Sequence, residues 1–246
     1  MTIDGATKLF PGITYGVSDT SDGNMSFTWG PTEEVIRNRE VFLRGKGLKL
    51  EDCAVMSLQH EEKIVIVGRD SLEKNVFASS EGIIAEALIT KEKGLTLFLM
   101  TADCLPIAYY DLKREIVALA HLGWKPTEKK LAAKVVREMV EKFETDPRDV
   151  IVLIGPGIHK DSYVFMNPQQ KQFAEWQPFL EETPSGETKI DLVGFNRDQL
   201  LRLGVLPRNI VIDPNDTAQS PRFYSHCRSL RTSEPEGRFA TIIGLK

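Results

Sequence analysis

The sequence contains few of the residues that stabilise secreted proteins. Among its 246 residues are only 3 cysteines, which are Cys53, Cys104 and Cys227. An odd number of distant cysteines is a poor basis for a disulfide framework, but it is compatible with one chemically used thiol. We therefore expect reduced thiols and exclude a disulfide-stabilised domain.

Long hydrophobic runs and an excess of positive charge are also absent. The N-terminal segment MTIDGATKLFPG lacks the basic start and the apolar run of a secretory signal, and no later segment approaches the ~18 consecutive apolar residues that span a bilayer. A net charge of -4 and an isoelectric point near 5.7 give no broad positive field. We therefore expect no nucleic acid and no membrane as partner, and a cytoplasmic location.

What is present is the composition of a folded domain. The hydrophobic fraction is 41% and the charged fraction is 27%, which is typical of a globular protein. No internal repeat, low-complexity stretch or long linker divides the chain. We expect residues 1–246 to form a single domain.

Hydrophobic periodicity predicts a mixture of strands and helices. Short apolar or β-branched runs predict strands at 53–60, 63–68, 95–100, 107–111, 115–121, 149–155 and 209–213. Amphipathic spacing and turn residues predict helices from Thr32 to Gly45, at 127–143, at 168–180 and at 191–203.

The lengths of the connections favour antiparallel neighbours. Only Glu61 and Glu62 bridge the first two strands, which suits a tight hairpin or a two-strand corner with His60 at its tip. A similarly short segment, LKR, joins the strands at 107–111 and 115–121. Because such connections outnumber helical crossovers, we expect an α/β (α+β) fold of mixed, largely antiparallel sheets flanked by helices.

Three potential metal ligands lie at the ends of predicted strands. His60 and His121 end apolar strands beside polar or glycine-rich turns, and Cys104 follows the strand at 95–100. One thiolate and two imidazoles that leave a coordination position open form a catalytic zinc arrangement. Spacing alone also fits ordinary packing residues, since buried cysteines after core strands and hydrogen-bonded histidines at strand ends are common. Both interpretations remain open at this point.

Other polar and aromatic residues also have two interpretations each. Asp103 either orients a ligating imidazole or simply belongs to a turn, and Trp124 either stacks on a base or covers the core edge. Arginines in loops either bind phosphate or are simply solvated. Both interpretations are open for Arg228, Arg231 and Arg238. We expect Cys53 to lie in the core. We expect His159 and His226 to lie in exposed loops.

The order of several short motifs resembles a known family. TADCLPI (101–107) followed by AHLGWK (120–125) is similar to the laccase-domain family, whose members are described as polyphenol oxidases and as purine nucleoside phosphorylases. The resemblance runs almost end to end. Further matching motifs are GVS (16–18), GNMSF (23–27), EEVIRNRE (33–40), LQH (58–60), ALIT (87–90), GPGI (155–158), FYS (223–225) and GRFATIIGL (237–245).

The resemblance implies a ligand set and an activity. The family motifs map a single zinc ion onto His60, Cys104 and His121. They also imply phosphorolysis of adenosine, inosine and methylthioadenosine, with hydrolytic deamination of adenosine, so that purine nucleoside and phosphate are the expected partners. Copper-dependent phenol oxidation is the lesser alternative, because three ligands cannot supply several copper sites. We expect a monomer or homodimer.

Several departures from the family pattern concern the substrate contacts. Leu122 replaces an alanine, and the Lys-Pro at 125–126 replaces Arg-Gly, so that an ammonium stands where a bidentate fork is usual. Gly157 and Ser162 stand where cysteines are usual, and 225–228 reads SHCR instead of SYRR. These differences concern substrate preference and leave the three ligands intact.

The expected mechanism uses zinc to polarise the attacking oxygen, which is phosphate at the anomeric carbon or water at C6 of adenine. Arg39, Lys125 and Arg228 are the expected phosphate or ribose contacts. A metal-free alternative follows from a resemblance of the fold to a bacterial deamidase toxin, in which Cys104 would attack an amide with His121 as base. A non-catalytic purine- or metal-binding protein is the other alternative.

Overall fold

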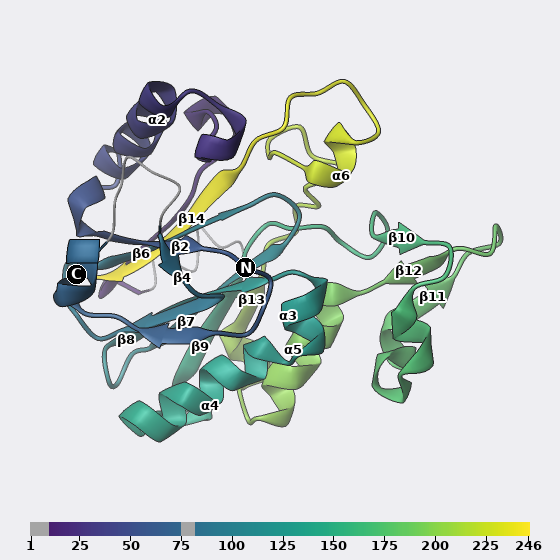
Figure 1. The fold of residues 1–246 in the computed structure, drawn as a ribbon. Coiled ribbons are helices and arrows are strands. Elements are labelled where there is room, and N and C mark those ends of the chain that lie inside the picture. Colours follow the sequence, from purple (N-terminus) through teal and green to yellow (C-terminus); the bar gives the residue numbers. More distant parts are fainter. Residues whose placement is uncertain (1–9, 75–81) are drawn as a thin grey trace.

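The chain forms three β-sheets and a set of flanking helices, described here from a computed structural model over residues 10–74 and 82–246 (Figure 1). The N-terminal part of the segment considered for a secretory signal, residues 1–9, lies outside the described residues. The five-stranded sheet has the order β1 (Ile13–Val17), β14 (Phe239–Leu245), β6 (Thr96–Thr101), β2 (Cys53–Ser57), β4 (Ile83–Ile84).

The other two sheets differ in size and in their distance from the core. The six-stranded sheet has the order β13 (Ile210–Ile212), β9 (Val150–Ile154), β7 (Leu105–Asp111), β8 (Ile116–Leu122), β5 (Ala87–Thr90), β3 (Ile64–Ile66). The three-stranded sheet, β10 (Val164–Phe165), β12 (Thr188–Ile190), β11 (Leu180–Glu182), projects from the body of the molecule (Figure 1).

The two large sheets pack face to face, with helices on both outer faces. Leu97 and Leu99 of β6 meet Leu119 of β8 in the apolar layer between the sheets. On β6, Phe98 points the other way and packs beneath α2 (Thr32–Arg44). Because every strand in the middle of this arrangement is covered on both sides, such strands are continuously apolar instead of alternating.

The outer face of the six-stranded sheet is covered by α4 (Leu131–Phe143) and α5 (Leu192–Arg202). Val135 and Val136 of α4 belong to the same buried cluster as Tyr109 of β7 and Phe195 of α5. Figure 1 shows α2 above the sheets and α4 below them. The result is a layered mixed α/β fold, in which antiparallel pairings predominate, as the sequence predicted.

The strands predicted at 53–60 and 63–68 do not form a hairpin. β2 pairs with β6 in one large sheet, whereas β3 pairs with β5 in the other, and both pairings are parallel. The connection is therefore a corner between sheets, which was the other alternative. The connection from β6 to β7, which contains Cys104, crosses between the same two sheets.

The structure also differs from the prediction at three helices. The predicted helix at 127–143 is divided into α3 (Trp124–Glu128) and α4 by Lys130, whose φ of 62° is left-handed. Pro31 caps α2 in place of Thr32 and makes no side-chain cap hydrogen bond. The helix predicted at 168–180 is wrong. Two short 3₁₀ helices occupy that segment, η6 (Gln169–Gln172) and η7 (Ala174–Phe179).

The reason is local backbone chemistry. Phe173 between the two 3₁₀ helices has an extended backbone, and Pro178 cannot donate the hydrogen bond that an α-helix requires. The remaining helical elements are η1 (Thr20–Asp22), η2 (Phe27–Trp29), η3 (Leu50–Asp52), η4 (Arg69–Lys74), η5 (Pro147–Asp149), η8 (Pro207–Asn209) and α6 (His226–Ser229). Over the described ranges, the helices are all too short or too polar to cross a bilayer.

Candidate metal centre

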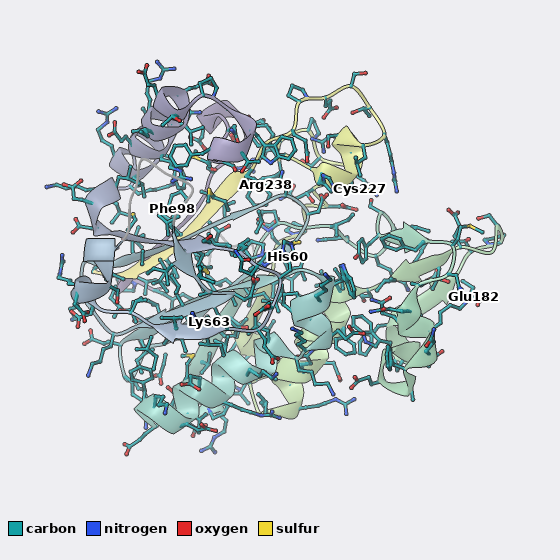
Figure 2. The ribbon with its side chains drawn as sticks, viewed as in Figure 1. His60, Lys63, Phe98, Glu182, Cys227 and Arg238 are labelled. Carbon is teal, nitrogen blue, oxygen red and sulfur yellow. The ribbon has the colours of Figure 1, made fainter. Side chains whose placement is uncertain are left out.

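His60, Cys104 and His121 meet at one end of the two-sheet sandwich. His60 lies in the β2–β3 corner, Cys104 in the β6–β7 crossover, and His121 is the second-last residue of β8. Their potential ligand atoms all lie within 4.8 Å of one another, and the two imidazole rings are perpendicular, with centroids 5.1 Å apart. Figure 2 shows His60 near the middle of the molecule. The structure thus brings together the three side chains singled out by sequence.

Both crossovers use left-handed backbone at the site. His60 has a φ of 60° and Asp103 a φ of 79°. Side chains other than glycine adopt this region infrequently, and such conformations gather at functional sites because the surrounding structure must hold them. The left-handed backbone at His60 and Asp103 turns the chain sharply. The chain can therefore leave one sheet, present a ligand and enter the other sheet within a few residues.

Glu86 fixes the orientation of His121. His121 Nδ1 donates to Glu86 Oε2 at 2.6 Å, and both side chains are buried. Glu86 Oε1 accepts from the backbone N–H of Gln59 at 2.7 Å, directly before His60. A single carboxylate therefore orients one candidate ligand and holds the turn that carries another. With Nδ1 donating to the carboxylate, the neutral form of His121 has a lone pair on Nε2 for an ion.

The charges at the site favour a thiolate. Burial raises the pKa of the Cys104 thiol, but the neighbouring His121 and His60 outweigh this and lower it to about 6. Burial lowers the pKa of His121, whereas the Cys104 thiolate and Glu86 raise it to about 9. Both shifts favour the charged forms of the two groups, and the thiolate is the form of cysteine that binds metals.

Gly123 lets the thiolate approach the backbone closely. A Cβ built on Gly123 would lie 2.9 Å from Cys104 Sγ and 3.7 Å from His121 Nε2. Real Cβ atoms do not come so close to sulfur, so any larger residue would push the thiolate away. The donor set of one thiolate and two imidazoles fits zinc, which binds such ligands at about 2.0–2.3 Å and keeps a fourth position open in catalytic sites.

A cavity of about 490 Å³ opens beside His60. We call it the His60 cavity; its lining includes Phe27, Trp29, Arg39, His60, Met100 and Arg238. Arg39 is only 1% exposed, and its guanidinium lies 4.3 Å above the Phe27 ring. Its Nε donates to the carbonyl of Met25, and burial lowers the Arg39 pKa to about 10. Arg238 lies above His60 in Figure 2.

The other sequence-predicted contacts lie elsewhere. Arg228 is half-buried and donates to the carbonyls of Thr217, Ser220 and Phe223 and to Glu234. Lys125 is exposed, with its ammonium 5.5 Å from the Trp124 ring centre. Neither residue lines the His60 cavity.

Asp103 does not orient an imidazole. Its Oδ1 accepts from the Thr217 hydroxyl at 2.7 Å and its Oδ2 from the backbone N–H of Cys227 at 2.6 Å. Asp103 therefore fastens the C-terminal segment to the β6–β7 crossover. Cys53 is buried and His226 exposed, as predicted, whereas His159 is half-buried instead of exposed.

Glu86 is the residue that sequence reasoning missed. It lies in the segment IIAEALIT, where it is the one charged residue among apolar neighbours. Charged groups are rarely buried without a partner, so an isolated carboxylate directly before the buried strand β5 was the available signal.

The fold and the site together define a layered α/β protein with a candidate thiolate-imidazole metal centre at one end of its sheets. The family model described as multi-copper polyphenol oxidoreductase laccase matches residues 10–246, and the chain belongs to this family. The family label describes an oxidoreductase, whereas curated relatives bear other names.

Relatives of this chain are named as purine-processing enzymes. The chain is 27% identical over 219 residues to purine nucleoside phosphorylase YlmD of Bacillus subtilis, which covers 87% of this chain and 78% of the relative. It is 30% identical over 205 residues to a purine nucleoside phosphorylase of Bacteroides thetaiotaomicron, covering 78% and 76%. An adenosine deaminase, RL5, from an unknown prokaryote is 29% identical over 173 residues, covering 67% and 65%.

A solved structure has the same fold. The crystal structure of YlmD from Geobacillus stearothermophilus superimposes with a TM-score of 0.87 at 26% sequence identity, covering 96% of this chain and 93% of that one. These names point to a nucleoside-processing enzyme.

Proposed function

We propose that this protein is a zinc-dependent purine nucleoside phosphorylase acting on adenosine, inosine and methylthioadenosine, with adenosine deamination as a side activity. The observation that carries the proposal is the buried guanidinium of Arg39 in the same cavity as the candidate ligand His60. The names of the relatives support the reaction, and the donor set supports the metal.

Arg39 has the properties of a phosphate contact. Within residues 10–74 and 82–246 no carboxylate forms an ion pair with it, and its Nη1 donates no hydrogen bond. A buried charge without a counterion is unfavourable, and an anion in the cavity would neutralise it. Guanidinium groups bind phosphate oxygens through charge-assisted, often bidentate hydrogen bonds. We therefore assign the phosphate to the His60 cavity, with Arg238 as a second cation in its lining.

Phosphorolysis exchanges one bond at the sugar for another. A phosphate oxygen forms a bond to C1′ of the ribose while the bond from C1′ to the purine nitrogen breaks. The electron pair of the broken bond goes to the purine nitrogen, which takes a proton, and the products are free purine and ribose 1-phosphate. In this scheme Arg39 binds and orients the phosphate. Glu86 holds His121 so that Nε2 faces the centre.

The residues that would hold zinc are His60, Cys104 and His121. When bound, zinc supplies Lewis-acid polarisation of an oxygen at the open position. The same centre suits hydrolytic deamination, in which water adds to C6 of adenine and ammonia leaves. The relative named adenosine deaminase supports that side activity.

The closeness of Cys104 and His121, whose potential ligand atoms lie within 4.8 Å of each other, favours one second candidate, a metal-free cysteine amidohydrolase with His121 as base. Copper-dependent phenol oxidation has less support, because in the described ranges only one group of three ligands was found. The lining of the His60 cavity favours the phosphorylase, since an amide substrate gives Arg39 no counterion.

The test is to incubate the pure, zinc-loaded protein with adenosine and inorganic phosphate and to separate the products by chromatography. We expect adenine and ribose 1-phosphate, a smaller amount of inosine, and loss of both zinc and activity in Cys104→Ser. Absence of all three products from protein that carries one zinc per chain would overturn the proposal. A zinc-free, alkylation-sensitive amidase activity would favour the second candidate.

A further inference from the structure

We propose that Thr217, which is far from the candidate ligands in the sequence, is a positioning residue for Cys104 and acts through the carboxylate of Asp103. This inference deepens the proposed function and rests on its metal centre. Asp103 directly precedes Cys104 in the β6–β7 crossover. Thr217 is fully buried, and its hydroxyl donates to Asp103 Oδ1 at 2.7 Å. The pair links the C-terminal part of the chain to the residue next to the thiol.

The backbone of Asp103 needs support from its surroundings. Its φ of 79° lies in the left-handed region, which side chains other than glycine adopt infrequently. Aspartate tolerates this region better than most residues, but such a conformation persists only where neighbouring contacts hold it. Because Cys104 is the next residue, the backbone angles of Asp103 set the direction in which the Cys104 side chain points.

Three hydrogen bonds supply this support. The carbonyl of Asp103 accepts from the backbone N–H of Ile158 at 2.7 Å. Its Oδ1 accepts from Thr217, and its Oδ2 accepts from the backbone N–H of Cys227 in α6, which Figure 2 labels. Asp103 is only 8% exposed, so these bonds lie in a low-dielectric environment that strengthens them. Both ends of the residue, the main chain and the carboxylate, are therefore fixed.

Thr217 is itself held on both sides. Its backbone N–H donates to the carbonyl of Gly157 at 3.0 Å, and its own carbonyl accepts from the guanidinium of Arg228. The residue before it, Asp216, forms a parallel bridge with Gly157. Because the backbone of Thr217 is fixed by these contacts, its hydroxyl is presented to Asp103 from a defined position.

The position of the Cys104 sulfur is correspondingly restricted. A Cβ built on Gly123 would lie 2.9 Å from Cys104 Sγ, so the sulfur already lies against the backbone on that side. Zinc binds a thiolate at about 2.3 Å, with a tolerance of a few tenths of an ångström. A change in the Asp103 backbone would therefore move the sulfur out of reach of an ion held by His60 and His121. Changing a group behind a metal ligand typically lowers metal affinity about 10–100-fold.

The test compares Thr217→Val with Thr217→Ser. Valine has the shape of threonine but lacks the hydroxyl, so Asp103 Oδ1 loses its donor, whereas serine keeps the hydroxyl. Competition with a fluorescent chelator measures the zinc affinity in the absence of nucleoside and phosphate. We expect the dissociation constant for zinc to rise about tenfold in Thr217→Val and to stay near the wild-type value in Thr217→Ser.

Cobalt(II) bound in place of zinc provides a second measurement. The charge-transfer absorption from the thiolate to cobalt depends on how the sulfur lies relative to the ion. We expect this band to weaken or shift in Thr217→Val and to keep its wild-type form in Thr217→Ser. A purely structural role of Thr217 would instead lower the melting temperature of the metal-free protein while leaving the cobalt spectrum and the zinc affinity unchanged, and that result would overturn the proposal.

Thr241→Val is the matched control. Thr241 is a fully buried threonine of β14, and its hydroxyl has no hydrogen-bond partner in the part of the chain that the structure describes. We expect its valine variant to bind zinc and cobalt as the wild type does. An equal loss of zinc affinity in Thr217→Val, Thr217→Ser and Thr241→Val would also overturn the proposal.

A second pair of variants tests the same contact from the other side, should Thr217→Val fail to fold. Asp103→Gly adopts the left-handed backbone freely but loses both side-chain hydrogen bonds, and we expect it to lose zinc affinity. In Asp103→Asn the amide oxygen can accept from the Cys227 N–H and the NH₂ group can donate to the Thr217 hydroxyl, so we expect affinity near that of the wild type. Equal affinity in Asp103→Gly and Asp103→Asn would contradict the proposal.

Failure of this inference and failure of the proposed function give different results. If zinc affinity falls only in Thr217→Val but the zinc-loaded wild type forms no ribose 1-phosphate, the role of Thr217 stands and the phosphorylase proposal fails. If the wild type forms ribose 1-phosphate and Thr217→Val binds zinc as tightly as the wild type does, the phosphorylase proposal stands and the role of Thr217 is overturned.

Discussion

Glu86 and His121 are joined twice, once through their side chains at 2.6 Å and once through the backbone N–H of His121, which donates to the Glu86 carbonyl at 2.8 Å. The second bond lies directly beside the antiparallel pairing of β5 with β8. Sheet register therefore determines which carboxylate faces the imidazole. Because the strands set this pair, the orientation of His121 is built before any ligand arrives.

Replacing Glu86 with glutamine tests that role. The amide keeps the size of the side chain but lacks the charge that orients a neutral imidazole with Nε2 free. We expect zinc affinity to fall about 10–100-fold, as is usual when the group behind a ligating histidine is changed. Competition with a fluorescent chelator measures the affinity.

The matched control is Glu62→Gln, because Glu62 forms only a surface ion pair with Lys134. Unchanged zinc affinity in both variants would show that the His121 ring keeps its orientation without the carboxylate.

Arg39→Met should separate phosphate binding from nucleoside binding. Methionine preserves apolar volume beside Phe27 and Phe98 while removing the cation. We expect the KM for phosphate to rise at least about tenfold, since a charge-assisted hydrogen bond is worth about 1.5–3 kcal/mol, and the KM for adenosine to change little. Steady-state kinetics at varied phosphate provides the measurement.

Arg37→Met serves as the comparison, because Arg37 is exposed on the same helix. If the two variants had the same KM for phosphate, the anion would have to bind outside the His60 cavity.

Gly123→Ala should damage the metal centre more than the fold. The added methyl group would lie 2.9 Å from Cys104 Sγ, so the sulfur must move away from the position it shares with the imidazoles. We expect weaker zinc binding, measured by metal content after dialysis, while the far-ultraviolet circular dichroism spectrum stays that of the wild type.

Gly45→Ala is a fair control, since its φ is -62° and the nearest atom would lie 3.4 Å from the new methyl group. An alanine at Gly123 that retained a full equivalent of zinc would show that the thiolate has room to shift.

Arg228→Met should lower stability more than it affects phosphate use. The guanidinium donates to three backbone carbonyls of the loop around 217–223, and their loss leaves acceptors unpaired. We expect a loss of about 2–3 kcal/mol in the free energy of unfolding, measured by urea denaturation, with a nearly unchanged KM for phosphate.

The exposed Arg231 gives the control variant Arg231→Met. A large rise in the KM for phosphate at unchanged stability would instead show that Arg228 contacts the phosphate.

The sequence predicted the approach of His60, Cys104 and His121 because chemistry-bearing residues followed apolar runs at strand ends. It did not predict how those ends meet. The spacing of β2 and β3 allowed a hairpin or a corner, and the choice depends on the partner strands, since β2 pairs with β6 in one large sheet and β3 with β5 in the other. Local patterns hold no information on which sheet a strand joins.

Burial of polar groups was the other quantity outside the reach of sequence patterns. Arg39 lies in a charged helix, where most arginines are solvated, and Glu86 lies in the short connection between β4 and β5, where no spacing rule marks a partner for His121. The segment at 168–180 shows the opposite failure. Its aromatic residues resemble an amphipathic stripe, but Pro178 and the extended Phe173 prevent a continuous helix.

The two crossovers have a mechanical consequence. His60 and Cys104 each lie where the chain passes from one large sheet to the other, so a cation shared by them cross-links the ends of the sandwich that the chain itself joins only by short turns. Ligand binding to the native state alone raises its stability in proportion to the logarithm of ligand concentration. The melting temperature of this protein should consequently rise with the concentration of available metal. When the cation is removed, the two sheets should separate first at that end.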